Sequence, residues 1–153
     1  MPNVERKFSP PKTDDEYFER MTRALFQSGL NWKMIDNKWP NFQKAFERFS
    51  IKKIARFENT DVRRLMNDKG IVRNERKIES TIFNAQQSLQ IMKEFGSFRE
   101  YFDSFGKSHT KLQEDLQSRF HHLGKSSSRT FLWMSGVKLV PTAEEKAWLS
   151  KHR

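Results

Sequence analysis

The chain has no cysteine, only two tyrosines and only six glycines among its 153 residues. The absence of cysteine excludes disulfide bonds, thiolate nucleophiles and zinc sites with cysteine ligands. So few tyrosines and glycines argue against a strand-and-turn architecture. No apolar run approaches the roughly 20 residues that a membrane-spanning helix needs, and Met1–Lys7 has no apolar signal core. We therefore expect a soluble intracellular protein with no membrane segment.

Basic and aromatic residues are abundant instead. Fourteen Phe and four Trp can form a core in a chain whose length suits one domain. The 29 Lys and Arg exceed the 19 Asp and Glu, which gives a formal net charge of +10. Such an excess indicates a polyanionic partner. A basic surface that only keeps the protein soluble is the alternative.

Apolar residues recur at helical spacing along most of the chain. Residues 1–12 contain three prolines and several charges, so we expect an irregular N-terminal arm there, followed by one helical domain over residues 13–153. Caps, glycines and prolines predict helices near residues 13–28, 31–49 (with a break near Trp39-Pro40), 51–57, 61–68, 76–95, 98–105, 110–120, 129–135 and 142–151. Because no segment alternates long enough for a strand, the sequence predicts an all-α fold.

The segment Leu123–Ser127 lies between two predicted helices and contains Gly124. A glycine at this place lets the backbone turn sharply and leaves free N–H groups at the start of the next helix. Such groups can bind a phosphate without reading base sequence. Lys125 and Arg129 add positive charge, and the serines add hydroxyl donors. The alternative is a glycine that only caps a helix.

A second junction, Leu65–Ile78, contains the apolar pair Ile71-Val72. Four cations surround this pair: Lys69, Arg73, Arg76 and Lys77. The junction predicts either an apolar tip flanked by phosphate contacts or an aliphatic pair buried under a turn. Composition alone favours the buried pair.

Several segments share their order and spacing with one protein family. They are Gln27–Trp32, Phe42–Phe46, Asp61–Leu65, Gly70–Asn74, Lys77-Ile78, Asn84-Ala85 and Gly96–Phe98. In this arrangement the sequence resembles the type I 3-methyladenine DNA glycosylases of the helix-hairpin-helix superfamily. Gly124–Gly136 matches the spacing of the family's hairpin and the helix after it, so that the resemblance covers about residues 14–141.

The resemblance implies a helix-hairpin-helix DNA glycosylase-like helical bundle that acts in base excision repair. Such an enzyme binds double-stranded DNA, flips an alkylated purine out of the helix and hydrolyses its N-glycosidic bond. We also expect a monomer that needs no cofactor, and no metal site, because the chain lacks the cysteines of the family's zinc site. We expect it in the cytoplasm, associated with the nucleoid if the source is bacterial.

The same resemblance assigns the site residues. Trp32 and Tyr17 match the base pocket, where an indole face attracts a cationic methylated adenine by roughly 0.5–2 kcal/mol. Ordinary core packing is the alternative for Trp32. Residues matching the loop that enters the minor groove are Gln27, Ser28, Gly29 and Leu30. The second probing loop and its flank are Ile71, Val72, Arg73 and Lys77, and the phosphate-binding hairpin is Leu123, Gly124, Lys125, Ser126, Ser127 and Arg129.

The sequence departs from the family at catalytic and metal positions. The family's pocket glutamate falls at Ala24, an aspartate used across the superfamily falls at Val140, and a zinc-binding histidine falls at Pro141. No histidine pair has a convincing metal spacing. The nearest replacement acids, each expected to be a solvated surface residue, are Glu19, Asp36, Glu144 and Glu145. Two other hypotheses stay open: a non-catalytic DNA-binding relative, and a helical protein-interaction domain whose charge is incidental.

Overall fold

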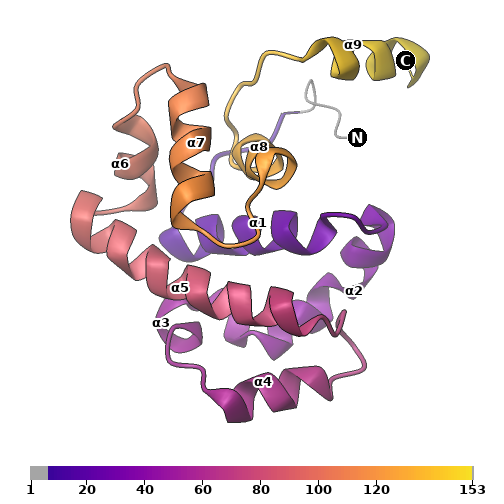
Figure 1. The fold of residues 1–153 in the computed structure, drawn as a ribbon, viewed down its shortest axis with the longest axis vertical. Coiled ribbons are helices and arrows are strands. Elements are labelled where there is room, and N and C mark those ends of the chain that lie inside the picture. Colours follow the sequence, from indigo (N-terminus) through magenta and orange to yellow (C-terminus); the bar gives the residue numbers. More distant parts are fainter. Residues whose placement is uncertain (1–6, 153) are drawn as a thin grey trace.

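A computed structural model of the protein describes residues 7–152 as helices joined by short loops (Figure 1). In chain order they are α1 (Asp14–Gln27), α2 (Trp32–Ala45), the 3-10 turn η1 (Glu47–Phe49), α3 (Ile51–Ile54), α4 (Asn59–Met66), α5 (Glu75–Phe95), α6 (Phe98–Asp103), α7 (His109–Arg119), α8 (Lys125–Met134) and α9 (Ala143–His152). Since this part of the chain contains no β-strand, the predicted all-α fold is confirmed.

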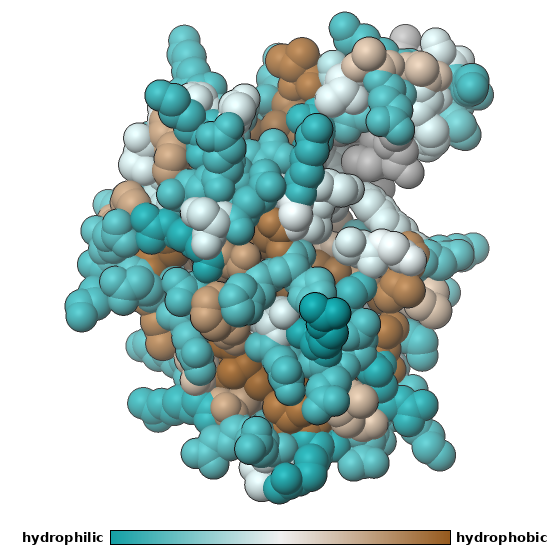
Figure 2. Space-filling model, viewed as in Figure 1, coloured by the Kyte–Doolittle hydropathy of each residue, from teal (hydrophilic) through white to brown (hydrophobic). Residues whose placement is uncertain are grey.

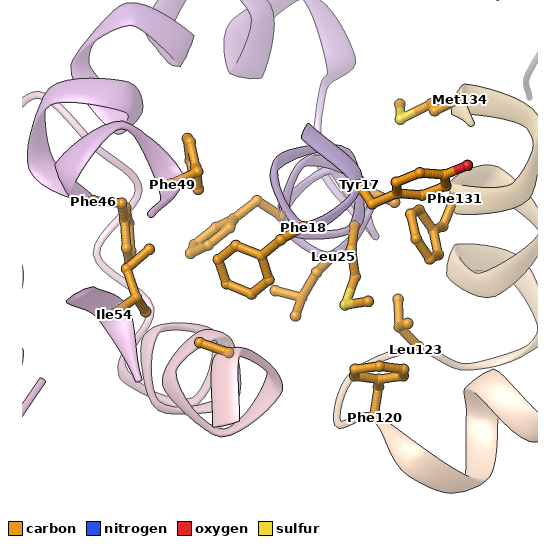
Figure 3. Packing of buried hydrophobic residues seen from close by; sticks show 14 of the residues in the cluster. Tyr17, Phe18, Leu25, Phe46, Phe49, Ile54, Phe120, Leu123, Phe131 and Met134 are labelled. Atoms are coloured by element: carbon orange, nitrogen blue, oxygen red, sulfur yellow. The ribbon is translucent and has the colours of Figure 1, made fainter. Parts of the chain in front are cut away.

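Helix α1 lies at the centre of the bundle and packs against both α5 and α8 (Figure 1). The close-up in Figure 3 shows Phe18 and Leu25 of α1 between two groups of apolar side chains. One group contains Phe46 and Phe49, and the other contains Phe131 of α8. The core is therefore continuous across α1, and this helix fixes how α8 sits relative to α2 and α5.

Side-chain caps begin several helices where the sequence predicted them. The Thr13 hydroxyl accepts a hydrogen bond from the Glu16 N–H at 3.1 Å, and Asn31 Oδ1 accepts one from the Met34 N–H at 3.1 Å. Each cap satisfies a backbone donor that the first helical turn leaves without a partner. The predicted cap at Thr142 is present as well, with its Oγ1 accepting from the Glu145 N–H at 3.1 Å.

The predicted break near Trp39-Pro40 is wrong, because α2 continues through Pro40 to Ala45. An interior proline costs a helix about 3 kcal/mol. Here Pro40 is exposed, while Trp39 and Phe42 on either side of it are buried and stacked with ring centroids 5.0 Å apart. This aromatic stripe holds the helix together across the proline.

The predicted continuation of the same helix to Phe49 is also wrong. The backbone turns left-handed at Glu47, Arg48 and Phe49, where φ is 52°, 53° and 58°. This turn lets Phe46 and Phe49 both enter the core, with stacked rings whose centroids are 5.7 Å apart. Burial of two phenylalanines compensates for a backbone conformation that costs non-glycine residues roughly 1–2 kcal/mol each.

Part of the predicted N-terminal arm, residues 1–6, lies outside the described residues. Residues 7–12 form no helix, and the Phe8 ring meets the Trp133 ring edge-on at 4.7 Å. Gly136 has φ of 82°, and a Cβ there would lie 2.9 Å from the Phe8 carbonyl oxygen and from Pro10 N. A glycine is therefore required where this segment crosses the end of α8.

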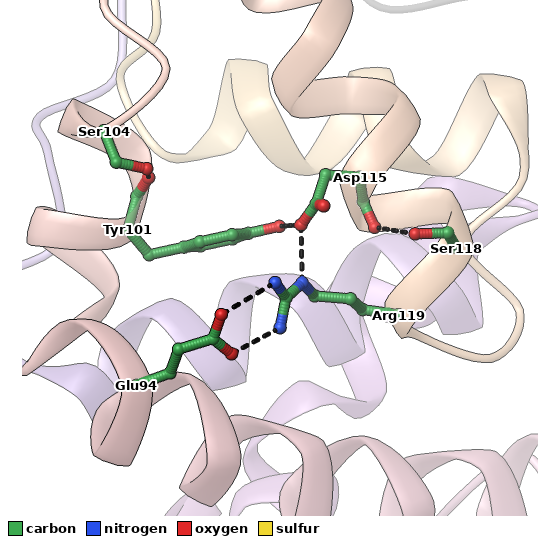
Figure 4. A network of polar contacts seen from close by, with 6 residues as sticks. All are labelled: Glu94, Tyr101, Ser104, Asp115, Ser118 and Arg119. Atoms are coloured by element: carbon green, nitrogen blue, oxygen red, sulfur yellow. Dashed lines mark hydrogen bonds and ion pairs between the residues drawn. The ribbon is translucent and has the colours of Figure 1, made fainter.

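A polar network holds α7 against α5 and α6 (Figure 4). The Tyr101 hydroxyl donates to Asp115 Oδ2 at 2.5 Å, and Arg119 donates to the same oxygen at 2.6 Å and to Glu94 at 2.9 Å. Burial and this hydrogen bond to Asp115 raise the pKa of Tyr101. The network fixes the direction in which the chain leaves α7.

Polar side chains cover most of the face that carries α5 and α7 (Figure 2). None of the helices in residues 7–152 is long and apolar enough to cross a membrane. Groups of three or more acidic or histidine side chains placed to hold a metal ion are also absent from this range.

Candidate nucleic-acid interface

The loop between α7 and α8 makes its sharp turn at His122, where φ is 57°, and not at Gly124, whose φ is −81°. A Cβ at Gly124 would meet nothing within 4 Å, so the fold itself does not require glycine there. Helix α8 begins directly after it at Lys125, four residues earlier than predicted. The missing side chain leaves the start of α8 open to close approach by an external group.

Ser127 closes this turn from inside. Its hydroxyl accepts a hydrogen bond from the Gly124 N–H at 3.0 Å and donates to the His122 carbonyl at 3.1 Å. Ser127 is buried, whereas Lys125 and Ser126 are exposed. The first N–H groups of a helix have no partner within the helix, so those of α8 are available at this exposed turn.

Helix α5 holds the α7–α8 loop through three side chains. Asn84 donates to the His121 carbonyl at 3.0 Å and accepts from the His121 N–H at 2.8 Å. Ser80 Oγ lies 2.7 Å from His122 Nδ1, and the Phe83 ring stacks on the His121 ring with centroids 3.6 Å apart. Asn84 belongs to the Asn84-Ala85 segment of the family resemblance, but no pattern in the sequence indicates a function for Asn84, Ser80 or Phe83.

The loop after α1 is partly buried and partly exposed. Gln27 is 2% exposed, and its Oε1 has no hydrogen-bond partner among the described residues. Ser28 and Gly29 are exposed, and Leu30 is half-buried. Gly29 has φ of 74°, a conformation that favours glycine. The tip of this loop is thus the pair Ser28-Gly29.

Lys77 lies in the interior beside this loop. It is 8% exposed, and its ammonium group donates to the Ser28 carbonyl at 2.9 Å and to the Phe26 carbonyl at 3.3 Å. Burial lowers the pKa of Lys77. The family resemblance predicts that Lys77 faces DNA, but its contacts in the structure join the first turn of α5 to the end of α1.

The second predicted probing loop also divides into buried and exposed parts. Ile71 is 3% exposed, Val72 is half-buried and Arg73 is exposed. Asn41 of α2 donates to the Gly70 carbonyl at 3.1 Å and so anchors the loop. Ile71 therefore fits the alternative of an aliphatic residue buried under a turn, while Val72 and Arg73 are the members that reach the surface.

The two predicted pocket aromatics contact different rings of the same core. Trp32 is half-buried, with its ring centroid 6.2 Å from that of Trp133. Tyr17 is buried in the core, stacked on Phe98 at 5.4 Å and edge-on to Phe102 at 5.1 Å. Burial, followed by the charge of Asp103, raises the pKa of Tyr17.

A family model of methyladenine glycosylases matches residues 6–132. The chain belongs to this family. DNA-3-methyladenine glycosylase 1 of Escherichia coli K12 is 32% identical over 102 residues, which are 66% of this chain and 54% of that protein. The Haemophilus influenzae DNA-3-methyladenine glycosylase is 28% identical over 113 residues, 73% of this chain and 60% of that one. The matched segments thus span little more than half of these relatives.

The fold is similar to solved structures of the same family. A variant of 3-methyladenine DNA glycosylase I in complex with 3-methyladenine has a TM-score of 0.77 and 25% identity, with 86% of this chain and 81% of that chain covered. A variant of the Staphylococcus aureus enzyme gives the same four values. These matches confirm the resemblance to type I 3-methyladenine DNA glycosylases and the predicted helical glycosylase-like fold.

Ala24, at the position of the family's pocket glutamate, is enclosed in this structure. Ala24 is 2% exposed and lies on α1, the helix against which α8 packs. Val140, the position of the superfamily aspartate, is 80% exposed. A carboxylate at the first position would be buried in the core, and one at the second would face solvent.

Three of the four predicted replacement acids are held by neighbouring side chains, whereas Glu144 is exposed, as expected. Glu19 accepts from Trp39 Nε1 at 2.9 Å, and Asp36 forms an ion pair with Arg23. Glu145 is buried, which corrects our expectation of a solvated acid, and it pairs with Arg129 through bonds of 2.6 and 2.9 Å. The hydrogen bond from Arg129 lowers the pKa of Glu145.

Arg129, which the sequence predicts in the phosphate-binding hairpin, instead contacts groups within the protein. Its guanidinium donates to the Val140 carbonyl at 2.8 Å as well as to Glu145. Arg129 thus joins α8 to the segment before α9, and Lys125 is the exposed cation at the start of α8.

Proposed function

We propose that the protein is a DNA-3-methyladenine glycosylase of base excision repair. It would bind double-stranded DNA as a monomer in the cytoplasm, flip an alkylated purine out of the helix and hydrolyse its N-glycosidic bond. Family membership supports this proposal, and so does the naming of its relatives as DNA-3-methyladenine glycosylases.

The main structural support for the proposal is that three loops distant in sequence all contact the first half of α5. Asn74 caps α5 at the end of the second loop, Lys77 holds the loop after α1, and Ser80 and Asn84 hold the α7–α8 loop. This arrangement supports the proposal, because the turn that we propose to bind phosphate and the two loops that we propose to probe the duplex would share one rigid element. Base flipping requires this combination of backbone contacts and side chains that enter the duplex.

The chemistry proposed at Trp32 requires little acid–base help. A 3-methyladenine nucleotide is already cationic, so its base leaves as a neutral molecule when the bond to C1′ breaks. Water then adds a hydroxyl group to C1′ and releases a proton to solvent. The indole face would attract the cationic base by roughly 0.5–2 kcal/mol, and selectivity for charged alkylpurines follows.

A second candidate function, a non-catalytic DNA-binding relative, is favoured by the burial of Ala24 at the position of the family's pocket glutamate. Base release from methylated duplex DNA, measured by chromatography beside duplex-binding titrations, separates the candidates. Release of 3-methyladenine supports the glycosylase. Binding without release supports the non-catalytic relative. Failure to bind duplex DNA would contradict both and leave a protein-interaction domain.

A further inference from the structure

A groove of about 770 Å³ lies between α5 and the α7–α8 loop, beside Gly124. Its sides come from the first half of α5 and from the loop itself, and the stacked pair Phe83 and His121 lies in it. The groove adjoins the exposed start of α8. The groove is therefore next to the start of α8, where the proposed function requires a DNA phosphate.

The charges around the groove are mainly positive. Helix α5 contributes Arg76, Lys77 and the acid Glu79, and the loop contributes His121 beside His122. The residue that α7 contributes is the neutral Gln117, and α8 begins with the exposed Lys125. Arg76 is exposed, so its guanidinium is available to a ligand.

His122 lies close to these positive charges. Its Nδ1 is 2.7 Å from Ser80 Oγ, which leaves Nε2 as the second ring nitrogen. Burial lowers the pKa of His122, and the charges of Arg76, Lys77 and His121 lower it further. These surroundings therefore favour the neutral ring in the free protein. An anion in the groove would offset those cations and favour the protonated ring.

We propose that this groove binds a phosphate of duplex DNA next to the one at the start of α8, and that His122 takes up a proton from solvent when it does. The inference rests on the proposed function, because it takes duplex DNA as the ligand. Arg76 forms an ion pair with this phosphate at every pH of the experiment, because arginine stays protonated. His122 forms a second ion pair only when its ring is protonated. When the ring is protonated, its Nδ1–H donates a hydrogen bond to Ser80 Oγ, and this contact keeps the ring oriented toward the groove.

Proton uptake on binding makes affinity depend on pH. In the free protein the pKa of His122 lies below its ordinary value, whereas a bound phosphate would raise this pKa. Affinity therefore rises as pH falls through the interval between the two pKa values, by at most about tenfold per pH unit for one proton. The additional ion pair also raises the log–log salt slope by about 0.9.

The experiment is a set of titrations of the full chain with a fluorescent undamaged duplex, at pH 5.5 to 8 and at several salt concentrations. We expect wild-type affinity to rise at least fivefold from pH 7.5 to pH 5.5. His122→Gln should abolish most of this rise, and Arg76→Gln should lower the salt slope by about 0.9 at every pH. His152→Gln on α9 is the matched control and should behave as wild type.

The outcomes separate this inference from the proposed function. If wild type does not bind the duplex at all, both fail. If it binds but His122→Gln keeps the full pH dependence, or Arg76→Gln leaves the slope unchanged, only the groove assignment fails. Arg76 is exposed and contributes no core packing, so its variant tests the groove even if His122→Gln alters the loop. Thermal melting of each variant checks that it is folded.

Discussion

Replacing Lys77 with methionine tests whether this residue holds a loop in place or contacts DNA. Methionine keeps most of the length and apolar volume of the lysine stem but removes the ammonium group. In the structure that group donates to the carbonyls of Phe26 and Ser28 at 3.3 and 2.9 Å. Both carbonyls lie at the end of α1, where the helix dipole favours a positive charge.

The size of the effect follows from these contacts. Buried carbonyls without a partner cost about 1–3 kcal/mol, and loss of a cation at a helix C-terminus costs about 0.3–1 kcal/mol. Burial of the charged ammonium group is itself unfavourable, which is why the pKa of Lys77 is lowered. Removing this charge therefore recovers part of the lost stability. We expect Lys77→Met to lower the free energy of unfolding by about 2 kcal/mol. For a domain of this size Tm then falls by about 4–8 °C.

Duplex binding provides the second measurement. A loop that has lost its anchor must be ordered on binding, and about 1 kcal/mol of ordering weakens affinity about fivefold. The salt slope should stay at the wild-type value, because Lys77 contacts no phosphate in this account. Arg73→Gln, which removes an exposed cation from the neighbouring loop, is the matched comparison and should lower the slope by about 0.9. If Lys77→Met lowers the slope equally, the internal role of Lys77 is refuted.

Three further predictions concern α1, α8 and α9. Ala24→Glu should destabilise the protein by at least about 3 kcal/mol, because it buries an unpaired carboxylate in a filled core; a melting temperature equal to that of wild type would reveal an open pocket there. Lys125→Glu should weaken binding to all duplexes alike and reduce the salt slope, whereas a change for one sequence only would contradict a phosphate contact. Glu145→Gln should lower stability by about 1–3 kcal/mol at pH 7. The pKa of Glu145 in the folded protein is below the ordinary 4.5, so this difference from wild type should disappear as pH falls through the folded pKa. A constant difference down to pH 2 would show that the ion pair is not its source.

Much of the fold was predictable because local signals and burial agree. The caps at Thr13, Asn31 and Thr142 and the long apolar stripe of α5 are visible in the sequence. The errors occur where tertiary packing overrides a local signal. Pro40 stays within α2 because aromatic residues pack on either side of it, and α8 starts at Lys125 because Ser127 closes the turn before it.

The candidate site was less predictable, because sequence spacing does not show which way a side chain points. The motif that contains Lys77 does not reveal that its ammonium group turns inward to the end of α1. Arg129 is likewise held by Glu145, which lies 16 residues later. Ser80 and Asn84 bind the α7–α8 loop through contacts between residues about 40 positions apart in the sequence, and no local pattern predicts such contacts.

The proposed function is tested most directly by the rate of base release from duplex DNA under single-turnover conditions, for 3-methyladenine and for the neutral lesion hypoxanthine. We expect measurable release of 3-methyladenine, little or no release of hypoxanthine, and loss of activity in Trp32→Ala with undamaged-duplex binding nearly unchanged. Efficient release of hypoxanthine would reveal a catalytic acid or base that the structure does not suggest. Release of neither base by a chain that binds duplex DNA would contradict the central claim that this protein is a glycosylase.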